Sequence, residues 1–245
     1  MLNRNPIIVI IDTGISANAS FLKDVIGNIS FYIEGDAIYI ADGNYDAIGH
    51  GTKVASCIKQ YCPQAKLFII NIYQNNLVTS SELLLEALKY LLAVEVDMIN
   101  ISLSVNSEEN ITEINNVLKQ LYDQGKIIVA AVKNGLKSSF PAESPHCIGV
   151  LGRKDIPIGR FIIDGTQTIQ ITTSVLPEQV EDLCGQRILF GGNSKATSCT
   201  TGCGASIMIG KGRMNMETLC QELLSAFGGQ TARLFRKGDC NEQGQ

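Results

Sequence analysis

The stretch "IIVIIDTG", residues 7–14, decides the fold. Its first five residues are all β-branched and aliphatic, whereas a strand with one face in water would alternate apolar and polar residues. The run therefore predicts a strand that is buried on both faces, and Asp12, Thr13 and Gly14 end it in a turn. Strands of this kind belong to parallel sheets that carry helices on both faces.

The rest of the chain alternates between strand and helix patterns. We expect further strands at residues 29–33, 37–41, 66–72, 97–102, 126–131 and 147–151. Helical spacing and stop signals predict helices at 52–60, 80–95, 110–124, 194–209 and 214–227. This order predicts the α/β class: a single domain over residues 1–236, with a mostly parallel sheet flanked by helices. Residues 237–245 form a polar tail, which we expect to be disordered.

Composition narrows the classes of function. The chain has 245 residues, 45% of them hydrophobic, and a net charge of -4 without a clustered basic stripe, so we expect no nucleic-acid partner. No apolar run near the start is long enough for a membrane span, and we expect no membrane partner. Eight cysteines lie scattered without a zinc-like spacing, so we predict reduced thiols, no metal and no cofactor. Nothing in the sequence sets the oligomeric state.

Polar residues follow several of the predicted strands, where the sheet's carboxyl edge places ligands. They are Asp12, Ser102 to Ser104, and Asn134. Asp12 and Asn134 each have a plain alternative: acids end strands in nucleotide and metal sites too, and Asn134 stands in an Asn-Gly turn. His50, in "GHGT" at residues 49–52, also fits a solvent-exposed turn.

Ser194 follows two glycines and Asn193 and opens a predicted helix. Serine is a preferred helix N-cap, which accounts for the residue without any catalytic role. The helix that follows is rich in Ala, Ser, Cys, Thr and Gly, so it is slim enough to run through the middle of a domain. A hydroxyl at its start would then emerge at a deep site, within reach of His50.

Taken together, these residues resemble a subtilisin-like serine protease (subtilase) over about residues 6–209. The resemblance rests on "VIIDTGI", "GHGTKVAS", "INISLS", "VAAVKNG", "FPAESPHCIGVLG" and "GNSKATS", in the family's order. It implies a subtilisin-like three-layer fold, a catalytic triad of Asp12, His50 and Ser194, and Asn134 in the oxyanion hole. It further implies that residues 102–104 (Ser102, Leu103, Ser104) bind substrate main chain and that Ser139 lies at the base of the S1 pocket.

The chain departs from the family pattern in the pocket. Asn193 stands where threonine is usual, Ser198 replaces a proline, Lys133 replaces a small residue, and Ser104 replaces a glycine. The changes at Asn193 and Ser198 remove no catalytic group, whereas those at Lys133 and Ser104 put the shape of the pocket in doubt. The segment after His50 leaves no room for the family's calcium loop, so we expect no high-affinity calcium site.

Met1 stands shortly before Asp12, without a signal peptide or propeptide, which predicts an intracellular, cytoplasmic enzyme.

The predicted function is a serine endopeptidase acting on a peptide or protein substrate. The small size and altered pocket favour a dedicated processing role, such as leader removal, over general protein turnover. A catalytically inactive scaffold of the same fold is the alternative from another class, because Lys133 and Asn193 could spoil the oxyanion hole. A peptide ligase would need an insertion that excludes water from the site, and the sequence has no obvious one.

Overall fold

The computed structural model describes residues 4–43, 45–73, 78–105, 109–227 and 230–233. The predicted polar tail at 237–245 lies outside the described residues.

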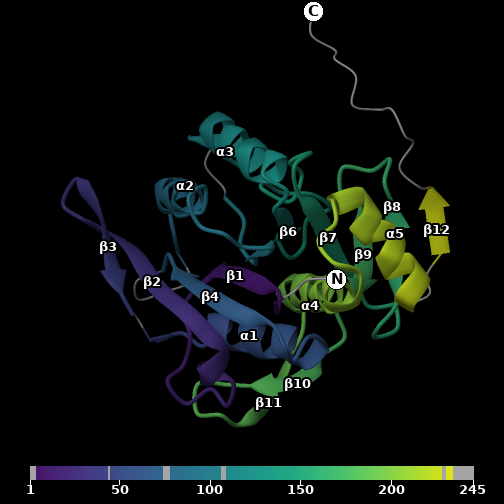
Figure 1. The fold of residues 1–245 in the computed structure, drawn as a ribbon, viewed down its shortest axis with the longest axis horizontal. Helices are drawn as coiled ribbons and strands as arrows, with labels where there is room; N and C mark the ends of the chain where they lie inside the picture. Colours follow the sequence, from purple (N-terminus) through teal and green to yellow (C-terminus); the bar gives the residue numbers. More distant parts are fainter. Residues whose placement is uncertain (1–3, 44, 74–77, 106–108, 228–229, 234–245) are drawn as a thin grey trace, which may run out of the picture.

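A ten-stranded sheet forms the middle of the described structure (Figure 1). Its spatial order is β12 (Gln230–Arg233), β8 (Phe161–Asp164), β9 (Ile171–Ser174), β7 (Ile148–Arg153), β6 (Ile127–Ala131), β5 (Met98–Ile101), β1 (Ile7–Asp12), β4 (Lys66–Asn71), β2 (Val25–Glu34) and β3 (Ala37–Asp42). All neighbouring pairs are parallel except β8 with β9 and β2 with β3. A separate antiparallel hairpin joins β10 (Glu178–Glu181) and β11 (Arg187–Phe190). The prediction of a mostly parallel sheet is confirmed.

Helices cover both faces of the sheet, which completes a three-layer α/β fold (Figure 1). One face carries α1 (His50–Tyr61), α4 (Asn193–Lys211) and α5 (Met216–Phe227). The other carries α2 (Ser81–Tyr90) and α3 (Ile111–Asp123). A short 3₁₀ helix, η1 (Leu22–Asp24), precedes β2.

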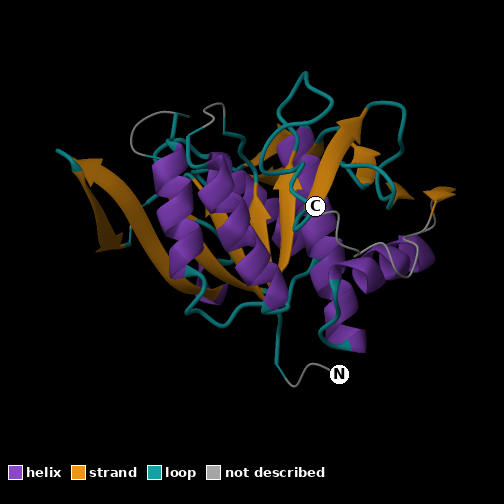
Figure 2. Cartoon of the chain, turned by 90° about the horizontal axis from the view of Figure 1, so that it is seen from above, coloured by secondary structure: helices purple, strands orange, loops and turns teal. Residues whose placement is uncertain are grey.

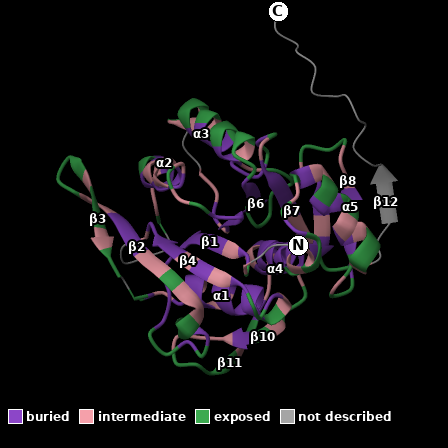
Figure 3. Ribbon diagram, viewed as in Figure 1, coloured by how far each residue is buried: buried purple, intermediate pink, exposed green. Residues whose placement is uncertain are grey.

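Strand β1 explains how the two cores form. Successive side chains of a strand point to opposite faces. Ile8 and Ile10 lie in the core under α1 and α4, and Val9 and Ile11 lie in the core under α2 and α3. Asp12 has the parity of Ile8 and Ile10, so the strand directs its carboxylate toward the layer of α1 and α4. Figure 3 shows the central strands buried and the β2–β3 hairpin reaching outward with much of its surface exposed.

The predicted elements are all present, with shifted ends. Helix α2 stops at Tyr90 instead of residue 95, and β2 starts at Val25, four residues earlier than expected. The short strands β8 to β12 were not predicted from the sequence. Each has only four residues, which are too few for a period to appear.

The cysteines of the described part, which are Cys57, Cys62, Cys147, Cys184, Cys199, Cys203 and Cys220, are free thiols, in line with the expectation for them. Within the described ranges, none of the helices combines the length and the hydrophobicity that crossing a membrane requires.

Candidate active site

The predicted site residues come together at the carboxyl edge of the sheet, where the central arrowheads point (Figure 2). Asp12 is the last residue of β1, and His50 is the first residue of α1. Ser194 is the second residue of α4, and Asn134 follows the end of β6 by three residues. Four segments that are distant in sequence therefore meet at one place.

Asp12 and His50 form a direct pair. The His50 Nδ1 atom lies 2.7 Å from Asp12 Oδ1, which also accepts the backbone N–H of Thr13 at 2.8 Å. The Asp12 side chain is only 2% exposed, whereas the His50 side chain is 21% exposed. Because an ionised carboxylate can only accept hydrogen bonds, Nδ1 carries the hydrogen and Nε2 is left as the free lone pair.

The surroundings of His50 change its basicity. Burial by itself lowers the pKa of the imidazole, but the charge of Asp12 and the hydrogen bond to it outweigh burial, and the pKa ends above its ordinary value of 6.5. Lys53 opposes this change and Asp46 adds to it. The Phe190 ring packs edge-on against the imidazole, with centroids 5.8 Å apart. His50 is thus a base held in one orientation, with its free nitrogen turned away from Asp12.

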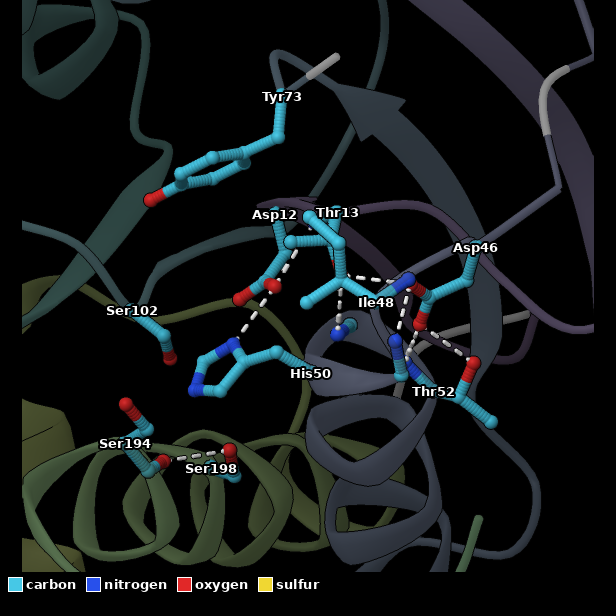
Figure 4. Close-up of polar contacts among 12 residues, drawn as sticks. Asp12, Thr13, Asp46, Ile48, His50, Thr52, Tyr73, Ser102, Ser194 and Ser198 are labelled. Atoms are coloured by element: carbon cyan, nitrogen blue, oxygen red, sulfur yellow. Dashed lines mark hydrogen bonds and ion pairs between the residues drawn. The ribbon is translucent and has the colours of Figure 1, made fainter. Parts of the chain in front are cut away.

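Ser194 lies opposite that free nitrogen. Figure 4 shows the Ser194 hydroxyl pointing from the start of α4 toward the His50 ring, and no hydrogen bond joins the two described side chains. The interpretation of Ser194 as the helix N-cap is wrong, because Gly192, with a positive φ of 87°, occupies that position. The hydroxyl is therefore not used for capping and remains available at the site.

The Asn134 side-chain amide has its oxygen bound to the backbone and its nitrogen unbound within the described part of the chain. Its Oδ1 accepts the backbone N–H of Asn193 at 3.1 Å, which leaves Nδ2 as a donor without a partner in the described residues. The backbone N–H of Ser194 lies in the first turn of α4, where a helix offers no acceptor of its own. Two N–H donors are thus available near the start of α4.

The departures at Asn193 and Lys133 do not fill this space. The Asn193 side chain is buried, accepts the Gly152 N–H at 2.9 Å and donates to the Val132 carbonyl at 2.7 Å, which ties the start of α4 to β6 and β7. Lys133 is exposed, and its backbone N–H donates to Ser139 Oγ at 2.8 Å. Both residues serve as anchors of the loop around Asn134.

The segment after β5 lies beside His50. Ser102 Oγ accepts from Asn100 Nδ2 at 3.0 Å, and Thr201 of α4 donates to Asn100 Oδ1 at 2.9 Å. Figure 4 shows the Ser102 hydroxyl facing the His50 ring. Leu103 is buried and Ser104 is half-buried, and the next residue, Val105, donates its N–H to the Phe140 carbonyl at 3.0 Å. This segment therefore runs next to the loop that contains Ser139.

Asp46 is a positioning residue that the sequence did not single out. Its buried carboxylate accepts five hydrogen bonds, from the N–H groups of Ile48, Gly49 and Thr52 and from the hydroxyls of Thr13 and Thr52. Thr13 in turn accepts the N–H of Gly51 at 2.8 Å, so Asp46 joins the end of β1 to the start of α1. Asp46 lies four residues before α1, too far for a helix-start signal, so the sequence alone gives no sign of its role.

Lys195 and Tyr73 are two further residues near the site that the sequence did not single out. Lys195, next to Ser194, is fully buried and pairs with Glu178 of β10. Glu178 also accepts from Tyr61 of α1 at 2.7 and 2.8 Å, so this cluster links α4, β10 and α1. Tyr73 lies near Asp12 (Figure 4), and burial, followed by the charge of Asp12, raises the pKa of its hydroxyl.

No group of three or more His, Cys, Asp or Glu side chains that could hold a metal occurs in the described part of the chain. The absence of a metal and of a cofactor stays a prediction.

Comparison with known proteins gives consistent matches. The family model Peptidase S8, described as the subtilase family, matches residues 3–245. A curated relative, the minor extracellular protease Epr of Bacillus subtilis (strain 168), is 25% identical over 162 residues, which are 61% of this chain and 24% of Epr. The chain therefore spans about a quarter of the length of that relative.

Solved structures share the fold at low sequence identity. The S41 psychrophilic protease superimposes with a TM-score of 0.75 at 20% identity, over 91% of this chain and 82% of that one. Sphericase gives a TM-score of 0.70 at 17% identity, over 89% and 82%. A cold adapted subtilisin-like serine proteinase gives 0.72 at 16% identity, over 89% and 80%. Since the family model spans nearly the whole sequence, this chain belongs to the subtilase family, peptidase family S8.

Proposed function

We propose that the chain is a serine endopeptidase that hydrolyses peptide bonds through an acyl-enzyme on Ser194. The observation that carries the proposal is the 2.7 Å contact between Asp12 Oδ1 and His50 Nδ1, with the Ser194 hydroxyl facing the opposite side of the ring. Acid, base and nucleophile stand in the order that a triad requires.

In the acylation step, His50 Nε2 takes the proton of Ser194 Oγ as that oxygen attacks the peptide carbonyl carbon. Asp12 stabilises the imidazolium that forms and keeps the ring in its tautomer. Asn134 Nδ2 and the Ser194 N–H donate to the carbonyl oxygen as its negative charge develops. His50 then gives the proton to the leaving amine, and the C–N bond breaks.

In the deacylation step, water takes the place of the amine. His50 removes a proton from that water as its oxygen attacks the acyl carbon, and the proton returns to Ser194 Oγ when the ester bond breaks. The His50 side chain is 21% exposed, so water can reach it for this step.

The substrate we propose is a peptide or protein segment in extended conformation. Its main chain pairs with residues 102–104, and Ser139 lies at the base of the pocket for the residue before the scissile bond. The altered pocket residues support a dedicated peptide-processing role, such as leader removal.

A fluorophosphonate probe tests the proposed nucleophile. We expect one adduct on the native chain, at Ser194, and none on Ser194→Ala. Ser198→Ala is the matched control, because Ser198 lies one turn further along α4 and its hydroxyl already donates to the Ser194 carbonyl at 2.7 Å. Absence of an adduct on the folded native chain would identify an inactive scaffold instead.

A second experiment tests the processing role. The native chain is incubated with a denatured protein and, separately, with peptides that carry candidate leader segments, and the cleavage sites are identified by mass spectrometry. We expect cleavage at few sites and only in the leader peptides. Broad degradation of the denatured protein would assign the chain to general turnover, with the triad unaffected.

A further inference from the structure

A cavity of about 560 Å³ adjoins Asn134, Gly192 and Asn193. Its walls are mainly apolar, formed by Leu136, Leu151, Val175, Leu176 and Pro177, and Lys154 is the one charged residue among the described residues that line it. The cavity contains none of residues 102–104 and not Ser139, so it is distinct from the pocket assigned to the residue before the scissile bond.

Strand order places this cavity relative to the scissile bond. The sheet runs β5, β6, β7, β9, with residues 102–104 after β5 and Asn134 after β6. The cavity is built from the ends of β7 and β9 and the glycines before α4, so it lies on the other side of Asn134 from residues 102–104. A peptide whose acyl part pairs with 102–104 therefore carries its leaving-group part past Asn134 toward the cavity.

Lys154 is free to meet a ligand. It is exposed and has no hydrogen bond or ion pair with any described residue. Its neighbours Arg153 and Asp155 pair with each other, with Arg153 Nε 2.9 Å from Asp155 Oδ1, so the Asp155 carboxylate is already engaged. An ammonium group beside apolar walls matches a side chain with an aliphatic stem and a terminal carboxylate.

We propose that Lys154 makes this cavity selective for an acidic residue, glutamate above all, within the first two positions after the scissile bond. The inference rests on the proposed peptidase function, which fixes the side of Ser194 on which the leaving group lies. Because an exposed ion pair contributes up to about 1 kcal/mol, the expected preference for glutamate over glutamine is up to about fivefold.

The experiment uses a synthetic peptide library and records the residue at each position around every cleaved bond. For the native chain we expect enrichment of glutamate at the first or second position after the bond. Lys154→Met should abolish it, and Lys154→Glu should replace it with a preference for lysine. Lys137→Glu is the matched control, because Lys137 is an exposed lysine next to Leu136 that does not line the cavity.

Binding separates failure of this inference from failure of the peptidase proposal. The same library is passed over immobilised Ser194→Ala, with and without Lys154→Glu, and the retained peptides are identified. Retention of acidic peptides that depends on Lys154, without cleavage by the native chain, would support the cavity's selectivity and overturn the peptidase function. Three outcomes would overturn the selectivity alone. They are cleavage without an acidic preference, an acidic preference confined to positions before the bond, and an equal effect of Lys137→Glu on the preference. If the library peptides are neither cleaved nor retained, both proposals are overturned.

Discussion

His50 shows how much of a functional residue is decided by its neighbours. The ring is fixed by a hydrogen bond from Nδ1 to Asp12, by the Phe190 ring at its edge, and by its place as the first residue of α1. Each of these contacts comes from a different element. The local "GHGT" pattern alone cannot distinguish this histidine from one in a solvent-exposed turn, because what separates the two is long-range contact.

The raised pKa of His50 predicts a pH dependence. The proposed base works only when neutral, so kcat/KM should fall as the pH drops through the His50 pKa, which lies above 6.5. In Asp12→Asn the two contributions of Asp12 that raise the pKa of His50 are removed or weakened, while burial and Lys53 still lower it, so the inflection should move to lower pH. The accompanying loss of rate is of the order of 10⁴ for a triad with the wrong tautomer.

Titration by NMR checks the same prediction without activity. The chain has two histidines, and burial, followed by the charge of Lys119, lowers the pKa of His146 below its ordinary value. In the native chain His50 should therefore titrate at a higher pH than His146, and the gap should shrink in Asp12→Asn. An unchanged His50 pKa in that variant would contradict the assigned role of Asp12.

Asp46 gives a prediction for a residue outside the proposed triad. In Asp46→Ala three backbone N–H groups and two hydroxyls lose their acceptor in a buried place, so we expect a loss of about 2–3 kcal/mol of unfolding free energy. Because these bonds hold the start of α1, kcat should fall more than KM rises. Denaturant unfolding and steady-state kinetics measure both effects.

The control for Asp46 is Asp42→Ala, which removes an exposed carboxylate a few residues earlier. Asp46→Asn should be intermediate, since it keeps the size of the side chain and one acceptor oxygen. Equal stability of the Asp42 and Asp46 variants would show that the carboxylate does not hold the loop.

At the level of elements, helix α4 carries the most unusual arrangement. Its small residues let it pass close to α1, where a side chain on Gly202 would collide with the α1 backbone at Ile58. Yet the same helix buries a lysine, Lys195, whose ammonium is matched by Glu178 on β10. The helix that carries the proposed nucleophile is thus held by close packing on one side and by an ion pair on another.

The Lys195 and Glu178 pair predicts strong coupling between α4 and β10. Removing one charge leaves the other in a poorly solvated place, so Lys195→Met should cost about 3 kcal/mol of unfolding free energy. The double variant Lys195→Met with Glu178→Gln should recover most of this loss, because Gln keeps an acceptor for the Tyr61 hydroxyl. Urea unfolding of the full cycle gives the coupling energy.

An exposed pair serves as the control for this cycle. Lys89 on α2 pairs with Glu86 and Glu113 at the surface, and Lys89→Met should cost no more than about 1 kcal/mol. A double Lys195 and Glu178 variant as unstable as the single one would mean that the ion pair is not what joins the two elements.

Elements with a clear local sequence pattern were predictable, and the others were not. The apolar run of β1 and the leucine spacing of α2 are properties of a single segment, so they can be read locally. Strands β8 and β9 are fixed by pairing with each other and with β12 and β7, and four residues do not show a period. For the same reason the partners of Asp46 and Lys195 could not be predicted, because they depend on which segments meet in space.

For the whole molecule, the sheet topology explains why the approximate place of the site could be predicted from the sequence. A parallel sheet brings the carboxyl ends of its strands to one edge, so the places of Asp12, Ser102 and Asn134 follow from strand order alone. The pairing of Asp12 with His50 came from the resemblance to the subtilase family, since no property of either segment names the other. The triad, the oxyanion donors and the residues of the substrate pocket stay predictions until they are tested.

The absence of a calcium site stays a prediction as well, and it can be tested on the intact chain. Stability here is expected to rest on the two apolar cores on either side of the sheet, so a chelator should leave the melting temperature unchanged. Thermal unfolding with EDTA, compared with added calcium, measures this. A melting temperature that rises with calcium concentration would reveal a site.

The placement of β1, α1 and α4 has a consequence for the order of events during synthesis. Asp12 and His50 leave the ribosome before Ser194, which is made last among the proposed catalytic groups together with the helix behind it. A nascent chain would therefore carry an acid and a base without a nucleophile, and could not cleave itself or its neighbours until α4 has been made. Stalled chains of increasing length, treated with fluorophosphonate, should first be labelled only when α4 has emerged in full.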